Sequence, residues 1–425
     1  MVSSRAMFET FLVVLTVVVL PAIILAIFMP CWTYQENTKR DKFLPEDSYF
    51  VNASLCDGTC KLRELSQEAA VDLSIIVPAF NEEKRLPAMM DATMEYMRVY
   101  SKNQGHNFKY EILIVDDDST DGTAAMALQY AAVTQAMVEA KERSLEHDSP
   151  RKVDVSVASA KSQPLASDCE SSSSNVEKEN CVGVDPNRVD SNNLAGRDGK
   201  MGTTAQNNGG DPDIRLLRLS RNHGKGGAIR RGVMHSRGDY VLFADADGAT
   251  DISYLDKLMQ TMKRIQRRHI PSPHPSAHAP PNAPLHGVVV GSRAHLESQS
   301  IAVRKWYRTV LMRGFHFLVK IVLNAGGGTI IRDTQCGFKL FTRRSARLLF
   351  LNLHLEGWVF DIELLYLADL MRVPIAEEAV AWTEVDGSKL IQNKLDIVFT
   401  SARMARDMLC MRLAYYTKIW KPIYV

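Results

Sequence analysis

The sequence of 425 residues predicts an α/β fold with a Rossmann-like, mostly parallel sheet. Short apolar runs rich in β-branched residues alternate with longer helical stretches, which is typical of a doubly wound sheet. Several of these runs end in acidic, basic or glycine-rich residues. Because ligands bind at the carboxyl ends of the strands in such sheets, these ends are the candidate functional site.

An apolar segment near the N-terminus predicts a transmembrane anchor over residues 7–29. Residues 11–29 are apolar apart from one threonine and one proline, and this length suffices to cross a bilayer core as a helix. One basic residue precedes the segment and three follow it, so the positive-inside rule favours a cytosolic body for the chain: Arg5, then Lys39, Arg40 and Lys42.

A cleavable signal peptide is the alternative to an anchor. Its apolar stretch would usually be shorter and end in small residues, whereas bulky residues at 28–32 end this one. The sequon Asn52-Ala-Ser54 would carry a glycan only if the body were luminal. Residues 30–70 are expected to form a polar linker.

The main domain, which we expect over residues 71–390, opens with two buried strands. Residues 73–78 and 110–115 are apolar and rich in β-branched residues, and a helical stretch at about 82–100 separates them. The polar run 116–123 then supplies the turn and N-cap residues of a further helix.

Three more strands complete the expected sheet, at 214–219, 238–247 and 287–293, and Gly224-Lys-Gly-Gly227 opens a helix between the first two. Two stretches without apolar periodicity interrupt the domain. We expect about 141–213, rich in Ser, Asn, Asp and Gly, to be a disordered surface insertion. Residues 271–286, rich in Pro and His, are expected to form an exposed loop, with metal binding by the histidines as the alternative.

The C-terminal part mixes apolar and basic residues over 306–323 and 395–420, and neither stretch is long and apolar enough to span a bilayer. Both suit amphipathic helices on a membrane surface, so we expect residues 391–425 to be membrane-associated helices. Helices that simply cover the sheet are an equally supported alternative.

Asp245 and Asp247 end one of the predicted strands. A strand sends residues i and i+2 to the same side, so both carboxylates can reach one bound species. Carboxylate oxygens with open positions for phosphate suit Mg²⁺ or Mn²⁺. Such a metal would neutralise a diphosphate leaving group.

Other strand ends point toward the same mouth. Acidic residues at Glu82 and at 116–118 can accept hydrogen bonds from a base or a ribose, and Arg293 can bind a phosphate through two nitrogens. The turn at 224–227 adds a helix N-terminus and the positive charge of Lys225.

Long motifs on these strand ends resemble those of the inverting family 2 glycosyltransferases: Val77-Pro-Ala-Phe-Asn-Glu-Glu83, Val115-Asp-Asp-Asp-Ser-Thr-Asp-Gly-Thr123, Asn222-His-Gly-Lys-Gly-Gly-Ala228 and Asp245-Ala-Asp-Gly-Ala-Thr250. Later motifs are similar to the polyprenyl-phosphate branch, in particular to its members that transfer glucose to dolichyl phosphate: Asp333-Thr-Gln-Cys-Gly-Phe-Lys339, Trp358-Val-Phe-Asp-Ile-Glu-Leu364 and Val385-Asp-Gly-Ser-Lys389. The resemblance covers about residues 73–421, less the two insertions.

The resemblance implies a GT-A fold, UDP-glucose as donor, dolichyl phosphate as acceptor and Mg²⁺ or Mn²⁺ as cofactor. The protein would lie in the endoplasmic reticulum membrane as a single-pass protein whose catalytic domain faces the cytosol, and it would supply lipid-linked glucose for protein N-glycosylation. Position by position, the resemblance assigns nucleotide-sugar binding to Pro78, Phe80, Glu82, Val115, Asp117, Lys225, Asp245, Ala246 and Lys389, metal binding to Asp245 and Asp247, and acceptor-phosphate binding to Arg293 and Arg308.

The implied reaction is a single in-line displacement with inversion. A phosphate oxygen is already anionic near neutral pH, so the site needs cations to hold two like-charged reactants more than it needs a base. Asp247, Arg293 and Asp361 are the expected catalytic residues. Asp361 and Glu363 are candidates for a base or a sugar-orienting carboxylate, with an acidic helix N-terminus after Gly357 as the alternative.

Two other functions are weighed against this one. The mannosyl branch has an arginine where this chain has Thr383, so a dolichyl-phosphate mannosyltransferase that uses GDP-mannose is the less favoured alternative. A non-catalytic membrane nucleotide-sugar binder is the second. A net charge of +2 gives no support to nucleic-acid binding, and the absence of G-x-G-x-x-G after the first strand argues against a dinucleotide oxidoreductase.

Overall fold

The computed structural model describes residues 49–51, 59–61, 64–105, 108–134, 213–268, 286–296, 331–383 and 394–424, with a few isolated positions besides. Within these ranges, no helix is long and apolar enough to cross a membrane. Several predictions fall outside the described residues: the anchor at 7–29 apart from Thr16, nearly all of both insertions and of 306–323, and the site residues Arg308 and Lys389.

A nine-stranded sheet forms the centre of the described chain, with the strand order β2-β1-β5-β4-β3-β6-β8-β7-β9. Its middle is the parallel block that the sequence predicted, in which Ile76 pairs with both Leu113 and Phe243. Because these strands are parallel, their carboxyl ends meet at one edge. They are β3 (Val71–Ala79), β4 (Tyr110–Asp116), β5 (Asp213–Arg218) and β6 (Gly238–Ala244).

Outside this block the sheet is mixed, so the prediction of a mostly parallel sheet is wrong there. β8 runs antiparallel between β6 and β7, and it therefore starts at the edge where the parallel strands end. The sequence analysis expected no strand at 338–342 or 375–379. Such runs of five residues have no periodicity that identifies them or fixes their direction, so both the strands and the reversal were missed. β1 and β2 arise within the expected linker. The bounds are β1 Tyr49–Val51, β2 Thr59–Lys61, β7 Val288–Ser292, β8 Phe338–Thr342 and β9 Ile375–Ala379.

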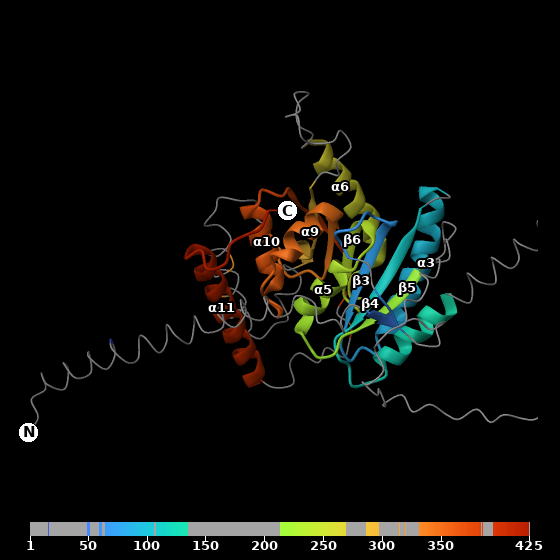
Figure 1. Ribbon diagram of the computed structural model, residues 1–425, viewed down its shortest axis with the longest axis horizontal. Coiled ribbons are helices and arrows are strands. Elements are labelled where there is room, and N and C mark those ends of the chain that lie inside the picture. Colours follow the sequence, from blue (N-terminus) through green and yellow to red (C-terminus); the bar gives the residue numbers. More distant parts are fainter. Residues whose placement is uncertain are drawn as a thin grey trace, which may run out of the picture. The chain divides into compact units, whose positions relative to one another are not determined.

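Helices cover both faces of the sheet, which confirms the predicted α/β arrangement (Figure 1). Leu73, Ile75 and Val77 of β3 pack in one apolar cluster and Ile76 packs in the other, and all four are fully buried. Helices α3 and α6 and the helical segment 123–134 belong to the first cluster, and α5, α9, α10 and α11 to the second. The bounds are α3 Leu86–Gln104, α5 Gly224–Met234, α6 Leu255–Arg268, α9 Arg343–Leu351, α10 Phe360–Leu370 and α11 Lys394–Tyr416, with short 3₁₀ helices at Ile252–Tyr254 and Ala294–Leu296.

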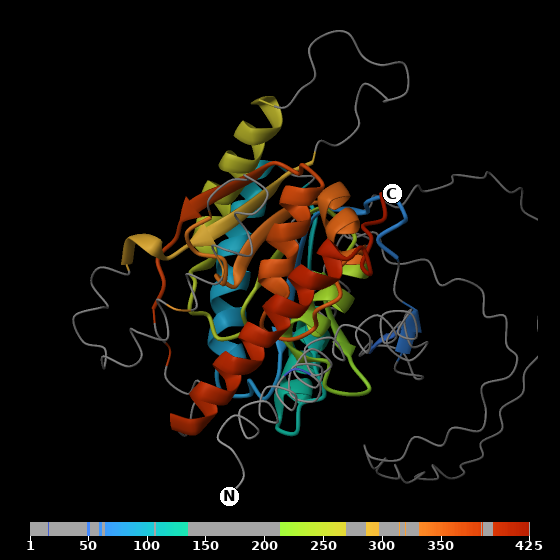
Figure 2. The same ribbon diagram turned by 90° about the vertical axis from the view of Figure 1, so that its left-hand side faces the viewer.

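Helix α11 lies over the helices of the second face, where it runs in front of the orange helices α9 and α10 in Figure 2. Met408, Met411 and Tyr415 on its inner side are buried in the same cluster as α10. This part of the C-terminal region therefore covers the sheet's helices, which was one of the two alternatives. Its membrane-surface role stays a prediction, which rests on the exposed side chains Phe399, Leu409 and Tyr416.

Candidate active site

Hydrogen bonds tie the end of β3 to the end of β4. Asn81 has a left-handed backbone (φ 57°), its N–H donates to Ser119 Oγ (2.9 Å), and its Oδ1 accepts from the N–H of Thr120 (2.8 Å). The N–H of Glu82 donates to Thr123 Oγ1 (2.7 Å). Asparagine is among the few non-glycine residues that adopt this backbone region readily. Two of the predicted strand ends are thus joined into one structural unit.

Arg85 links this unit to the acidic pair. Its guanidinium donates to both carboxylate oxygens of Glu82, at 2.6 and 2.5 Å, and one of its nitrogens lies 3.8 Å from Asp247 Oδ2. The predicted nucleotide contact of Glu82 would therefore have to be shared with Arg85. The sequence reasoning missed Arg85, although a basic residue directly before a helix that follows an acidic strand end is a pattern that could have identified it.

Asp117 connects the end of β4 to the glycine-rich turn. The N–H of His223 donates to Asp117 Oδ1 (2.7 Å), and Asn222 Nδ2 donates to the Asp117 carbonyl (3.1 Å). Burial raises the pKa of Asp117 to about 6, and the hydrogen bond from His223 opposes this rise. Asp117 is only 3% exposed, and its carboxylate already binds the turn into α5 through His223. Contact with a base would be an additional role of this residue.

The glycine-rich turn packs against the loop that precedes α10. The N–H of Gly227 donates to the carbonyl of Glu356 (3.0 Å), and a side chain at Gly226 would collide with Phe360. Gly224 has a φ of +78°, a region that favours glycine. The sequence indicated that the backbone of this turn closely approaches another group. In the structure that group is the loop that carries Glu356. Binding of a phosphate by the turn stays a prediction.

Asp245 and Asp247 lie in a tight turn after β6 and not on the strand itself, so the predicted strand alternation is wrong here. Gly248 has a φ of +68°, and Asp247 Oδ1 accepts from the N–H of Ala249 (3.0 Å). Both carboxylates still reach the mouth of the sheet, with side chains 31% and 29% exposed. Asp245 Oδ1 lies 2.7 Å from Lys225 Nζ, and Asp247 Oδ2 lies 3.8 Å from a nitrogen of Arg85.

The donor set of this pair fits one kind of metal site. In the described ranges, no group of three or more His, Cys, Asp and Glu side chains comes together as a complete protein site. Mg²⁺ commonly binds through one or two carboxylates and completes its shell with substrate phosphates and water. Asp245 and Asp247, both partly exposed, fit that arrangement, and Mg²⁺ or Mn²⁺ stays a proposal for them.

Gly337, the residue before β8, touches Asp245. Its carbonyl accepts from the N–H of Asp245 (3.1 Å), and a Cβ at this position would overlap the Asp245 carboxylate. Gly337→Ala is expected to displace this carboxylate and to lower the initial transfer rate at least about tenfold, a barrier rise of about 1.4 kcal/mol. In an Asp245→Asn background the same change should add little further loss, because both act on one group. An undiminished rate for Gly337→Ala would contradict the placement of Asp245.

Asp361 lies in the first turn of helix α10 and forms an ion pair with Lys339 of β8. Lys339 Nζ lies 2.6 Å from Asp361 Oδ1 and 2.6 Å from the carbonyl of Cys336, and Lys339 is fully buried. Burial raises the pKa of Asp361, and the charges of Lys339 and Lys225 oppose this rise. The sequence placed Asp361 in the site but missed Lys339, although a lysine inside an apolar strand is an unusual residue that could have identified it.

Glu363, the other acidic candidate in the same helical turn, points away from the acidic pair. Its carboxylate accepts from the N–H groups of His354 (3.1 Å) and Leu355 (2.7 Å) and from the hydroxyl of Tyr415 (2.8 Å). Glu363 is fully buried by these partners. Glu363 therefore fixes α11 and the loop before α10 to α10 itself. Of the two acidic candidates, Asp361 is the one whose charge acts on Lys225, and its role in the site stays a prediction.

Arg293 follows β7 and is bound by Asp333. Its Nε donates to Asp333 Oδ2 (2.7 Å), a second nitrogen donates to Oδ1 (3.0 Å), and its guanidinium lies 5.5 Å from the centre of the Trp382 ring. Although burial lowers the pKa of Arg293, Asp333 raises it above its usual range. The predicted contact with a phosphate would therefore use the nitrogens that Asp333 leaves available.

The other predicted positions divide between surface and interior. Phe80 is 45% exposed beside the strand ends, which suits contact with a ligand. The side chains of Val115 and Ala246 are buried, so they support the residues at the surface of the site. Pro78, the penultimate residue of β3, is partly exposed. The structure thus brings the described members of the predicted set to one edge of the sheet.

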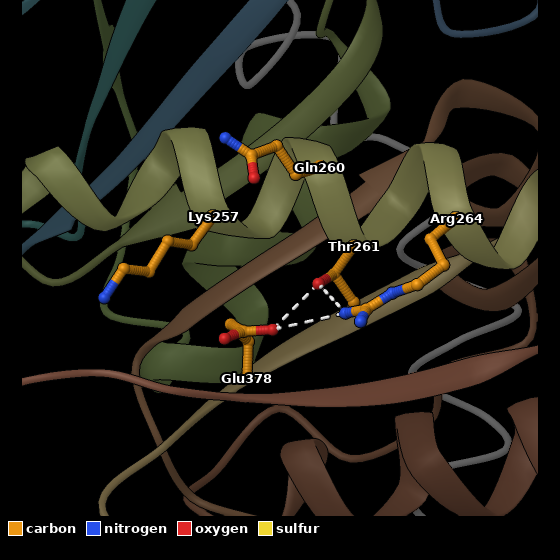
Figure 3. Close-up of a pocket in the computed structure, with 5 residues that line it drawn as sticks. All are labelled: Lys257, Gln260, Thr261, Arg264 and Glu378. Atoms are coloured by element: carbon orange, nitrogen blue, oxygen red, sulfur yellow. Dashed lines mark hydrogen bonds and ion pairs between the residues drawn. The ribbon is translucent and has the colours of Figure 1, made fainter.

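A pocket of about 360 Å³ lies between α6 and β9 and is lined by Lys257, Gln260, Thr261, Arg264 and Glu378 (Figure 3). Thr261 Oγ1 donates to Glu378 (2.8 Å), and Arg264 lies 3.7 Å from the same carboxylate. Glu378, the acidic residue that lines this pocket, is therefore paired with two other lining residues, Thr261 and Arg264. Helix α6 belongs to the opposite face of the sheet from α5 and α10, which carry Lys225 and Asp361, so this pocket is separate from the candidate site.

Comparison with known proteins shows what this arrangement belongs to. The family model "Glycosyl transferase family 2" matches residues 74–142 and 200–270, which contain the ends of the four parallel strands. Dolichyl-phosphate beta-glucosyltransferase of Mus musculus is 35% identical over 92% of this chain and 87% of its own length. The proteins of that name from Dictyostelium discoideum and Saccharomyces cerevisiae are 34% and 29% identical, over 92% and 95% of this chain and 87% and 93% of their own.

Fold, site and matches define a glycosyltransferase of family 2. Within that class, the chain belongs to the dolichyl-phosphate beta-glucosyltransferase family. Among solved structures, glucosyl-3-phosphoglycerate synthase of M. tuberculosis aligns over 81% of this chain and 80% of its own at 13% identity, with a TM-score of 0.34. That likeness is too distant to relate individual residues.

Proposed function

We propose that the chain transfers glucose from UDP-glucose to dolichyl phosphate and forms dolichyl β-D-glucosyl phosphate. Its relatives, named as dolichyl-phosphate beta-glucosyltransferases and matched over about nine-tenths of the chain, support this proposal. The structural observation that supports it most is the gathering of Lys225, Asp245, Asp247 and Asp361 where the four parallel strands end.

The donor half of the site would use the carboxylates and cations of this edge. Asp245 and Asp247 would hold Mg²⁺ or Mn²⁺, and a metal bound there supplies positive charge for the diphosphate leaving group. Lys225 lies in the first turn of α5, so it would add a second positive charge beside a helix N-terminus. Phe80 would offer its exposed ring to the base.

The transfer would be one in-line displacement that changes the anomeric configuration from α to β. An anionic oxygen of the acceptor phosphate attacks the anomeric carbon, and UDP leaves from the opposite side. Because this oxygen is already charged near neutral pH, the residues mainly hold and align the reactants. We propose Arg293 and Arg308 for the acceptor phosphate, Lys389 for a donor phosphate, and Asp361 for the sugar.

The acceptor is a lipid, so the enzyme must work at a bilayer. An anchor at 7–29 in the endoplasmic reticulum membrane would raise the effective concentration of acceptor and enzyme for each other. The exposed apolar residues of α11 support a contact with that surface. In this proposal the catalytic domain faces the cytosol and the product supplies glucose for protein N-glycosylation.

Transfer with two donors tests the proposal directly. Membranes containing the full chain should convert UDP-glucose and dolichyl phosphate to a glucosylated lipid that is β-linked, and addition of a chelator should stop the conversion. Membranes without the chain are the control. Conversion with GDP-mannose alone would contradict the glucose donor, and binding of UDP-glucose without any transfer would favour a non-catalytic binder.

A further inference from the structure

Trp358 is an exposed aromatic residue beside the acidic pair. It is 42% exposed, whereas Val359 and Phe360, which follow it, are buried. The ammonium of Lys225 lies 5.7 Å from the centre of the Trp358 ring and 2.7 Å from Asp245. Ring, ammonium and carboxylate therefore stand next to one another at the mouth of the sheet.

The loop that carries Trp358 is held from the side of α5. The carbonyl of Glu356 accepts from Gly227, and its carboxylate lies 3.1 Å from a nitrogen of Arg231. Glu356 is thus fixed two residues before the tryptophan by both its backbone and its side chain.

The same loop is held from the side of α10. Glu363 accepts from the N–H groups of His354 and Leu355, and the hydroxyl of Tyr415 donates to Glu363 from α11. These bonds fix the backbone before Trp358, and the buried residues Val359 and Phe360 fix it after the ring, which is 42% exposed. A ring held in this way is preorganised, so little conformational entropy is lost when a ligand packs on it.

We propose that Trp358 is the surface on which the hexose of the donor packs, a role that rests on the proposed function. A pyranose has one face made largely of C–H groups, and an indole offers both apolar area and a polar N–H. The anomeric carbon is bonded to an oxygen of the diphosphate. A sugar whose diphosphate meets Lys225 can therefore reach the ring, which lies 5.7 Å from that ammonium.

The prenyl chain of the acceptor is the other apolar group that could meet this ring. The neighbours of Trp358 favour the sugar, because Lys225 and Asp245 are the groups proposed for the donor diphosphate. A platform for the sugar has a distinct consequence. It should affect the binding of UDP-glucose and leave the binding of UDP unchanged, since UDP lacks the sugar.

Titration calorimetry of the full chain in detergent, with Mg²⁺ present, separates the two ligands. Trp358→Ala is expected to raise the Kd for UDP-glucose about tenfold, or about 1.4 kcal/mol, and to change the Kd for UDP by less than twofold. Trp358→Phe should retain most of the affinity, and Trp358→Leu, which keeps apolar bulk without a ring, should not. Leu370→Ala is the matched control, because Leu370 lies on α10 and is also 42% exposed.

The outcomes are distinguishable. Equal weakening of UDP and UDP-glucose would overturn the sugar contact and assign the ring to the nucleotide or to loop order. Unchanged binding of both, with a raised KM for the lipid acceptor, would assign it to the prenyl chain. A wild-type chain that binds neither nucleotide would instead overturn the proposed function. Should Trp358→Ala fail to fold, the comparison of the Phe and Leu variants carries the same test.

Discussion

Asp247→Asn should reduce glucosyl transfer by about a thousandfold, in line with the loss of one fixed charge that stabilises a transition state. The amide keeps the size of the side chain and can still accept from the N–H of Ala249. What it loses is the negative charge that we propose for the metal. Initial rates with UDP-glucose and dolichyl phosphate measure the loss, and Mn²⁺ binding followed by electron paramagnetic resonance should weaken in parallel.

Asp251→Asn is the matched control for this change. Asp251 is exposed in the same connection, and its carboxylate accepts from the N–H of Ser253 (2.8 Å), as Asp247 accepts from Ala249. Its neutral variant should keep transfer within about twofold, as is usual for surface changes away from such a site. Undiminished transfer by Asp247→Asn, or equal loss in both variants, would show that Asp247 is not a metal ligand.

Lys339→Met should destabilise the protein by about 3 to 5 kcal/mol, because it leaves a buried carboxylate without its cation. Lys339 and Asp361 have side chains 0% and 4% exposed, so water cannot replace the lost contact. The change would also remove the contact that holds the Asp361 carboxylate near Lys225. Denaturant unfolding of the full chain in detergent measures the stability, and transfer rates below the unfolding range measure the activity.

Two comparisons separate this effect from a general loss of charge. Arg98→Met removes a cation from the exposed pair with Glu95 on α3 and should leave the denaturant midpoint nearly unchanged, because solvent screens that pair. Lys339→Met combined with Asp361→Asn should recover part of the stability, since no charge is then left unpaired, but not the activity. If Lys339→Met were as stable as Arg98→Met, the buried pair could not hold Asp361 in place.

The sequence by itself determined the parallel block and the residues at its carboxyl ends. Each central strand is buried on both faces, so it is a continuous apolar run that can be recognised locally. The acidic and glycine-rich residues follow these runs directly along the chain. Asp117, Lys225 and the pair Asp245 and Asp247 could therefore be placed at one edge of the sheet before the structure was known.

Only the tertiary structure decided how these groups are paired and which of them are free to act. Asp361 and Glu363 look equivalent in the sequence, but residues two apart on an α-helix point about 200° apart. One therefore faces Lys339 and the site, and the other faces Tyr415 and the core. Lys339 itself reaches Asp361 from β8, an antiparallel strand whose direction depends on its neighbours in the sheet and on no local pattern.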